Sequence, residues 1–120
     1  FRSWLSIIKT DHYDASHVCW AYRIQVDSEL YEHSSDAGEP SGTAGAPILK
    51  ILKQNNLIQC GLIAVRYFGG TKLGRKGLID AYRNAAVYVV NNSNLMKWVN
   101  TKRYIITCPI NYYGELIQAF

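Results

Sequence analysis

The segment RYFGGTKLGRKGLIDAY, residues 66–82, combines residue types that hold anions. It runs from a strand-like apolar stretch, through a glycine loop, into a helix-like stretch. Backbone N–H groups and the positive end of a helix meet anions in this order of elements. We expect the anion to contact the backbone of the loop glycines, which are Gly69, Gly70, Gly74 and Gly77.

Two nucleotide-binding spacings fail in this loop. The motif GxxxxGK[ST] fails because Arg75 follows Gly74 where a lysine is required, and GxGxxG fails because no two loop glycines are separated by one residue. A generic anion site or an RNA-backbone site remains compatible with the loop. The alternative is a tight turn that carries solvated lysines.

Clustered cations favour the anion-binding interpretation. The 120-residue chain has a net charge of +4, and residues 66–83 alone hold five cations against one acid. Residues 27–39 hold five acids and no Lys or Arg. Such clustering favours an anionic partner. The cations expected to contact phosphates are Arg66, Lys72, Arg75, Lys76 and Arg83, joined by Arg23 if residues 18–26 and 58–68 form neighbouring strands in register.

His17, Asp36 and Glu39 are weak candidates for acid–base chemistry. His17 shares a predicted strand face with Cys19, but residues two apart on a strand are about 6–7 Å apart at Cα, so packing is favoured over a nucleophile pair. Asp before a helix serves more often as a cap than as a catalyst, and Glu39 is the acid least readily explained as a cap. The sequence contains no CxxC or HxxxH pair, so no metal site and no cofactor are predicted.

These candidates support an enzyme as the alternative to a binding protein. Such an enzyme would be a hydrolase or transferase that acts on a phosphorylated small molecule or nucleotide, with Asp36 or Glu39 as acid or base and His17 as partner. It requires His17, Glu39 and the loop at 69–77 to converge on one pocket. It would fail if His17 were buried and hydrogen-bonded to the backbone. Whether the chain is an enzyme stays open, with a binding role preferred.

The elements that position these residues follow from hydrophobic periodicity. We expect a helix over 1–10, a strand over 18–26 with Trp20 and Tyr22 in the core, and a loop over 34–47. A helix to about 55, a central strand over 58–68 with Phe68 exposed, and a helix to about 91 should follow. A further strand over 103–110 and a helix after it would open a second domain. The domain boundaries expected are therefore 1–99 and 100–120.

Composition places the chain among globular proteins. The length suits one ordinary domain, and no apolar run reaches the roughly 20 residues that span a bilayer, so no membrane is expected. Three cysteines, odd in number and far apart, suggest reduced thiols in a cytoplasmic protein. The oligomeric state does not follow from the sequence.

Three segments together resemble one known family. They are ASHVCWAYR (15–23), SDAGEPSGTAGAPIL (35–49) and VRYFGGTKLGRKGLIDAY (65–82), in this order and at close spacing. The chain is similar to the IMPACT (YigZ-like) family over about residues 12–93. The resemblance implies a ribosomal protein S5 domain 2-like fold, an α/β (α+β) two-layer architecture in which a mixed or mostly antiparallel sheet is backed by helices. It also implies a first strand before residue 1 and a ferredoxin-like second domain that begins near residue 100.

The resemblance also implies a function. Eukaryotic relatives act in translational control by binding the activator of the amino-acid-starvation kinase. The preferred function is therefore non-enzymatic binding in translation regulation or stress response, with RNA, the ribosome or a translation-associated protein as partner. A third possibility is a protein-interaction module that does not use the cationic loop.

This chain departs from the family pattern in two places. Ala37 and Ala46 stand where the family commonly has Asp and Arg, and Arg75 and Lys76 replace Thr and Gly in the loop. The loop thereby loses one glycine and gains two cations. A surface that binds polyanions tolerates this exchange better than a catalytic phosphate loop does, because the backbone of such a loop must approach its ligand closely.

Overall fold

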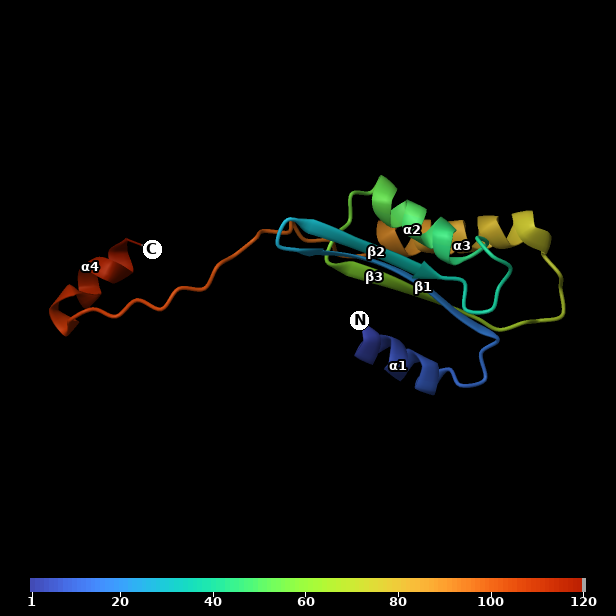
Figure 1. Ribbon diagram of the computed structural model, residues 1–120, viewed down its shortest axis with the longest axis horizontal. Helices are drawn as coiled ribbons and strands as arrows, with labels where there is room; N and C mark the ends of the chain where they lie inside the picture. The colour runs from blue at the N-terminus through green and yellow to red at the C-terminus, as the bar shows by residue number, and fades with distance from the viewer. Residues whose placement is uncertain (120) are drawn as a thin grey trace.

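A computed structural model describes residues 1–119 of the chain. It contains a three-stranded antiparallel sheet in the order β2-β1-β3, with helices packed against it (Figure 1). This combination confirms the predicted α+β class. The elements in chain order are α1 (Arg2–Asp11), β1 (His17–Val26), β2 (Glu29–Ser35), α2 (Gly45–Gln54), β3 (Cys60–Arg66), α3 (Gly74–Asn91), a 3-10 turn (Ile110–Tyr112) and α4 (Tyr113–Gln118).

The core lies between one face of the sheet and helices α2 and α3. Cys19 and Ala21 of β1 are fully buried on this face. The apolar spacing of α2 and α3 directs one stripe of each helix toward these residues. The helix residues buried in the same cluster are Ile48, Ile51, Leu52, Leu78, Tyr82, Ala86 and Val90.

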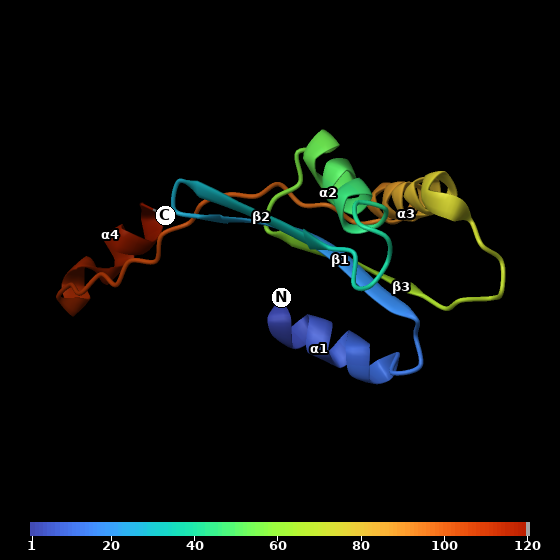
Figure 2. The same ribbon diagram turned by 45° about the vertical axis from the view of Figure 1, so that its right-hand side comes forward.

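The prediction that Trp20 and Tyr22 lie in this core was wrong. Both side chains lie on the opposite face of β1, half-buried against α1, where the Phe1 ring centroid is 5.4 Å from that of Trp20 and 5.0 Å from that of Tyr22. Figure 2 shows α1 on this side of the sheet, away from α2 and α3. Strict alternation identifies two faces but not which one is the core when helices cover both. The small side chains of Cys19 and Ala21 allow the helices to pack closely.

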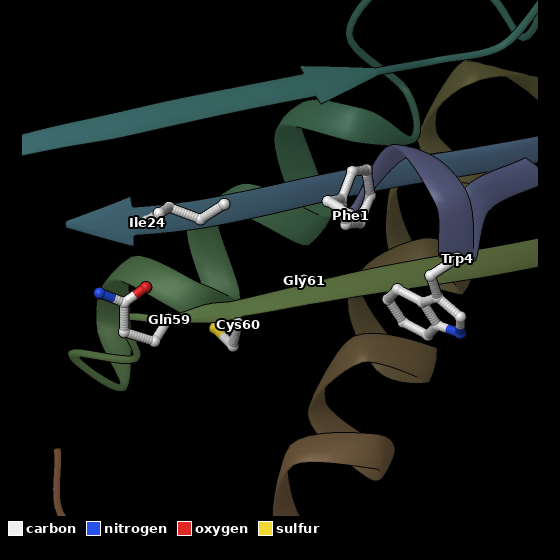
Figure 3. A pocket seen from close by; sticks show the side chains of 6 residues that line it. All are labelled: Phe1, Trp4, Ile24, Gln59, Cys60 and Gly61. Carbon is white, nitrogen blue, oxygen red and sulfur yellow. The ribbon is translucent and has the colours of Figure 1, made fainter. Parts of the chain in front are cut away.

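Phe1 also explains one glycine of β3. Figure 3 shows Phe1 beside Gly61, at a hollow of about 240 Å³ between α1 and the sheet. A Cβ at Gly61 would lie 2.6 Å from the Phe1 ring, so a larger residue would displace the ring. The ring of Phe1 therefore packs over Gly61 and holds the N-terminal end of α1 against the sheet.

The strands differ from the prediction in two respects. Strand β2 was not expected, because its residues lie in the acidic segment and are mostly exposed. It forms a hairpin with β1 through Asp27 and Ser28, and Asp27 adopts a φ of 53°. Residues 58–68 were expected to form a central strand, but β3 is an edge of the described sheet and β1 is central.

The chain beyond α3 leaves the sheet. Residues 94–109 contain no helix or strand; residues 94–98 lie beside residues 56–60, and the chain then runs away from the sheet to α4 (Figure 1). The strand expected at 103–110 is not formed, because a strand needs a neighbour for its hydrogen bonds and none of the three described strands pairs with it. The helix expected after it is present as α4. Across residues 1–119, no helix is both long enough and apolar enough to cross a membrane.

Candidate functional site

One end of the sheet carries a groove of about 430 Å³. The antiparallel register places His17, the first residue of β1, opposite Arg66, the last residue of β3. The acidic loop between β2 and α2 and the start of α3 close the sides. The residues that line the groove are His17, Glu39, Pro40, Arg66, Phe68, Lys72, Leu73, Gly74, Arg75 and Leu78.

Glu39 forms the polar floor of this groove. Its side chain is only 2% exposed, and its Oε1 accepts hydrogen bonds from Nη1 of Arg66 and, at 2.9 Å, from the hydroxyl of Tyr82. The hydrogen bond with Glu39 raises the pKa of Arg66 against the opposing effect of desolvation. Burial, followed by hydrogen bonds with Cys19 and Glu39, raises the pKa of Tyr82, which therefore remains a neutral donor.

His17 presents one ring nitrogen to the groove. Its Nδ1 lies 2.9 Å from the carbonyl oxygen of Ala37. Because a carbonyl can only accept, Nδ1 must carry the proton of this hydrogen bond. Nε2 then faces Glu39, 3.8 Å from its Oε1, and the imidazole remains 23% exposed. The backbone contact thus orients the ring without burying it.

Cys19 does not form a nucleophile pair with His17. Its thiol is fully buried and donates to the carbonyl of Asp36 at 3.0 Å, and its Sγ lies 3.3 Å from the hydroxyl oxygen of Tyr82. Burial raises the pKa of the Cys19 thiol, although the hydrogen bond with Tyr82 lowers it in part. A buried, protonated thiol is a poor nucleophile, so Cys19 serves packing, as the sequence favoured.

Asp36 caps helix α2. Its Oδ1 accepts from the amides of Ala44 and Gly45 at 2.9 and 2.8 Å, and its Oδ2 accepts from the amide of Gly42 at 2.9 Å. Desolvation opposes ionisation here, but the three amides and the charge of Arg75 lower the pKa of Asp36 overall. The preference for a capping role over acid–base chemistry agrees with this geometry.

The glycine loop contributes to the groove mainly through its second half. Lys72 and Arg75 line the groove beside Gly74, where α3 begins, and Nη2 of Arg75 donates to the carbonyl of Ser41 at 2.9 Å. The other predicted contact residues of this region lie outside the groove lining. They are exposed in the loop (Gly69, Gly70) or lie in α3 (Lys76, Gly77, Arg83).

Phe68 has the exposed ring that the sequence predicted. The residue is 51% exposed, and its ring centroid lies 5.6 Å from Cζ of Arg66, which is a cation–π distance. Its amide donates to the hydroxyl of Ser16 at 3.1 Å, which links the start of the glycine loop to the residue before β1.

Arg23 is not part of the groove. The strands at 18–26 and 58–68 are neighbours in register, but they are antiparallel, so Arg23 pairs with Cys60 at the other end of the sheet. Its guanidinium donates to Glu32 and to the carbonyls of Leu52 and Leu57. These contacts link the sheet to α2.

The convergence on one pocket that an enzyme would require is present in part. His17, Glu39 and the end of the glycine loop at Gly74 line one groove. His17 is hydrogen-bonded to the backbone, but through the nitrogen that faces away from Glu39. No cluster of His, Cys, Asp or Glu suited to a metal ion occurs in the described part of the chain.

Tyr82 is the functional residue that sequence reasoning missed. Its place in the apolar stripe of α3 suggested only packing. A buried tyrosine hydroxyl nevertheless requires a hydrogen-bond partner, and this requirement was the available signal. Its partners, Cys19 and Glu39, lie 63 and 43 residues away in the sequence.

Comparisons with known proteins agree with the resemblance of the three motifs. The family model described as Impact N-terminal domain matches residues 1–90. The chain is 38% identical over 96 residues to IMPACT family member YvyE of Bacillus subtilis, covering 80% of this chain and 44% of that protein. It is 30% identical over 109 residues to IMPACT family member YigZ of Escherichia coli, covering 89% and 53%.

A solved structure shares the fold. The crystal structure of a hypothetical protein matches with a TM-score of 0.70 and 32% sequence identity, over 76% of this chain and 45% of that one. The present chain spans about half the length of the curated relatives it matches, since it covers 44% and 53% of the two described above.

Proposed function

The chain belongs to the IMPACT family, and from this premise we propose that it is a binding protein of the translation or stress-response system that holds RNA phosphates in its basic groove. The observation that carries the proposal is a pair of cations, Lys72 and Arg75, that line the groove and form no salt bridge with a described residue. Within residues 1–119, the four salt bridges use His17, Arg23, Lys53 and Arg66. Lys72 and Arg75 are not among them, so each can pair with a phosphate of a ligand.

The N-terminal end of α3 supports the same proposal. Asp36 already fills the N-terminal end of α2 with a carboxylate. Helix α3, by contrast, begins at Gly74 without a side-chain cap and without an acid in its first turn. An uncapped helix start has free amides and a partial positive charge, which together bind phosphate oxygens. These amides lie beside Lys72 and Arg75.

Phe68 provides a surface for a base next to the phosphate site. The half-exposed ring and Lys72 line the same groove. Bases of single-stranded RNA stack on such rings without sequence preference, and each stack contributes about 1–3 kcal/mol. A phosphate contact beside a stacking ring suits a single strand better than a duplex, in which the bases are already stacked.

The test measures how affinity for RNA depends on salt. Fluorescence anisotropy of a labelled single-stranded RNA of about 12 nucleotides should give a log–log slope of about −0.7 for each phosphate contact. The double variant Lys72→Ala/Arg75→Ala removes both groove cations and should flatten this slope by about one to two units. A matched control, Lys102→Ala/Arg103→Ala, removes the same charges from an exposed segment outside the groove.

The control separates a local site from a general effect of net charge. It should leave the slope close to that of the unaltered chain. An affinity independent of salt, or no binding at micromolar protein, would exclude the RNA proposal. If the loop variant leaves capture of a protein partner unchanged while RNA binding is absent, the protein-interaction module becomes the better explanation.

A further inference from the structure

The free ring nitrogen of His17 has the position of a general base. Nδ1 donates to the carbonyl of Ala37 at 2.9 Å, so the neutral imidazole has its lone pair on Nε2. Nε2 faces the groove that Glu39, Lys72 and Arg75 also line. A hydrogen bond from the far nitrogen to a backbone carbonyl holds the imidazole in the tautomer that accepts a proton at the near nitrogen.

Glu39 prepares the site for the positive charge that forms when Nε2 takes a proton. Its Oε1 lies 3.8 Å from Nε2 and is held by donors from Arg66 and Tyr82. No buried side-chain polar atom of residues 1–119 lacks a hydrogen-bond partner. Because these donors hold the carboxylate in place, it stabilises an imidazolium without rearranging.

We propose that the groove cleaves the RNA that it binds, with His17 as the general base that activates a ribose 2′-hydroxyl. The inference rests on the RNA-binding function proposed above. RNA suits the groove because its nucleophile belongs to the ligand, so the reaction needs no co-reactant. DNA lacks this hydroxyl and cannot react in the same way.

Each atom and charge of this step is accounted for. The 2′-hydroxyl proton moves to Nε2 of His17, and O2′ forms a bond to the adjacent phosphorus. The bond between phosphorus and O5′ breaks, and the departing oxygen takes a proton from solvent at the exposed side of the groove. The products are a 2′,3′-cyclic phosphate and a free 5′-hydroxyl. Lys72 and Arg75 would stabilise the charge that develops on the phosphate oxygens.

The experiment uses the 120-residue chain and an RNA of about 12 nucleotides with a 5′ label. A second substrate has the same sequence with one ribose in an otherwise deoxy strand. Cleavage should occur only at the ribose and leave a cyclic phosphate, and the all-deoxy strand should stay intact. Any cleavage of the all-deoxy strand overturns the mechanism.

The variant His17→Asn removes the base but keeps an N–H donor for the carbonyl of Ala37. It should bind the all-deoxy strand within about twofold of the unaltered affinity and cleave the RNA at least about 100-fold more slowly. Equal cleavage by both proteins would identify a contaminating nuclease and overturn the inference. Salt-dependent binding without cleavage would overturn this inference alone, whereas absence of binding would also overturn the proposed function.

A second variant covers the case in which His17→Asn fails to fold. The side chain of Lys72 is exposed at the groove, so Lys72→Ala should fold normally. It should lower the single-turnover cleavage rate at saturating protein by about tenfold or more, because the lost ammonium stabilises developing charge. An unchanged rate in Lys72→Ala would overturn the inference independently of His17.

Discussion

His17 and Arg66 face each other across the ladder of β1 and β3. This register brings the start of the first strand and the end of the third to one edge of the groove. Glu39 joins them from the loop after β2, through its contacts with both side chains. The candidate site is therefore built by strand pairing, and a one-residue slip in register would move His17 to the opposite face.

Replacing Glu39 with Gln tests how much the groove floor contributes to stability. The amide oxygen can still accept hydrogen bonds, but the guanidinium of Arg66 loses its only anionic partner in the described chain. Removing one member of a largely buried pair leaves an uncompensated charge, so Glu39→Gln should lower the free energy of unfolding by about 2–3 kcal/mol. Urea denaturation followed by tryptophan fluorescence measures this change.

Glu32→Gln is the matched control for this substitution. Glu32 pairs with both Arg23 and Lys53, but its side chain is 22% exposed and that of Lys53 is 47% exposed, so water reaches these pairs. Surface pairs contribute little because water and salt screen them. Glu32→Gln should therefore destabilise the chain less than Glu39→Gln, and the reverse order would contradict the assignment of Glu39 as the buried centre.

Asp36 should make part of the stability depend on pH. Three backbone amides and Arg75 outweigh desolvation and lower its pKa below the ordinary value of 3.8. A lowered folded-state pKa means that the carboxylate stabilises the fold above the unfolded-state pKa, and that this contribution is lost as pH falls through the folded-state pKa. Asp36→Asn should thus cost about 1–2 kcal/mol at neutral pH.

The difference between the unaltered chain and Asp36→Asn should shrink below about pH 4, since protonated Asp resembles Asn. Urea titrations at about pH 7 and about pH 3 measure it. A difference that stayed constant over this range would show that the charge of Asp36 does not stabilise α2.

Local patterns predicted the elements that periodicity marks strongly. The helices at Gly45–Gln54 and Gly74–Asn91 and the strand at His17–Val26 lie close to the expected residues. Strand β2 escaped prediction because an exposed edge strand needs no apolar alternation. Trp20 and Tyr22 were assigned to the wrong face because helices cover both sides of β1.

The residues of the candidate site were harder to predict from the sequence than the helices and strands. The sequence marked Glu39 as an acid that a helix-capping role does not readily explain. It did not identify the partner of Glu39, because Arg66 lies 27 residues away. Such contacts depend on strand register, which the hydrophobic pattern of separate segments does not specify. The same register places Arg23 outside the groove, because antiparallel pairing puts it at the opposite end of the sheet from Arg66.

The three cysteines should differ in reactivity. Cys19 is fully buried, and burial raises the pKa of its thiol, whereas Cys60 and Cys108 are partly accessible. Only the thiolate reacts with iodoacetamide, so Cys19 should be alkylated at least about 100-fold more slowly than Cys108 in the folded chain. Peptide mapping by mass spectrometry measures the rates, and in denaturant all three should react equally. Rapid labelling of Cys19 without denaturant would contradict its place in the core.

Gly45 should be the glycine least tolerant of substitution. A Cβ there would lie 2.8 Å from both the backbone nitrogen and the carbonyl carbon of Ser35, and strand backbone cannot move aside as a flexible side chain can. Gly45→Ala should therefore lower the free energy of unfolding by about 1–3 kcal/mol, although alanine favours a helix more than glycine does. Gly69→Ala is the control, because a Cβ at Gly69 meets nothing within 4 Å and should change stability by less than about 0.5 kcal/mol. Thermal or urea denaturation of both variants decides the matter, and equal stability would mean that β2 and α2 can separate without cost.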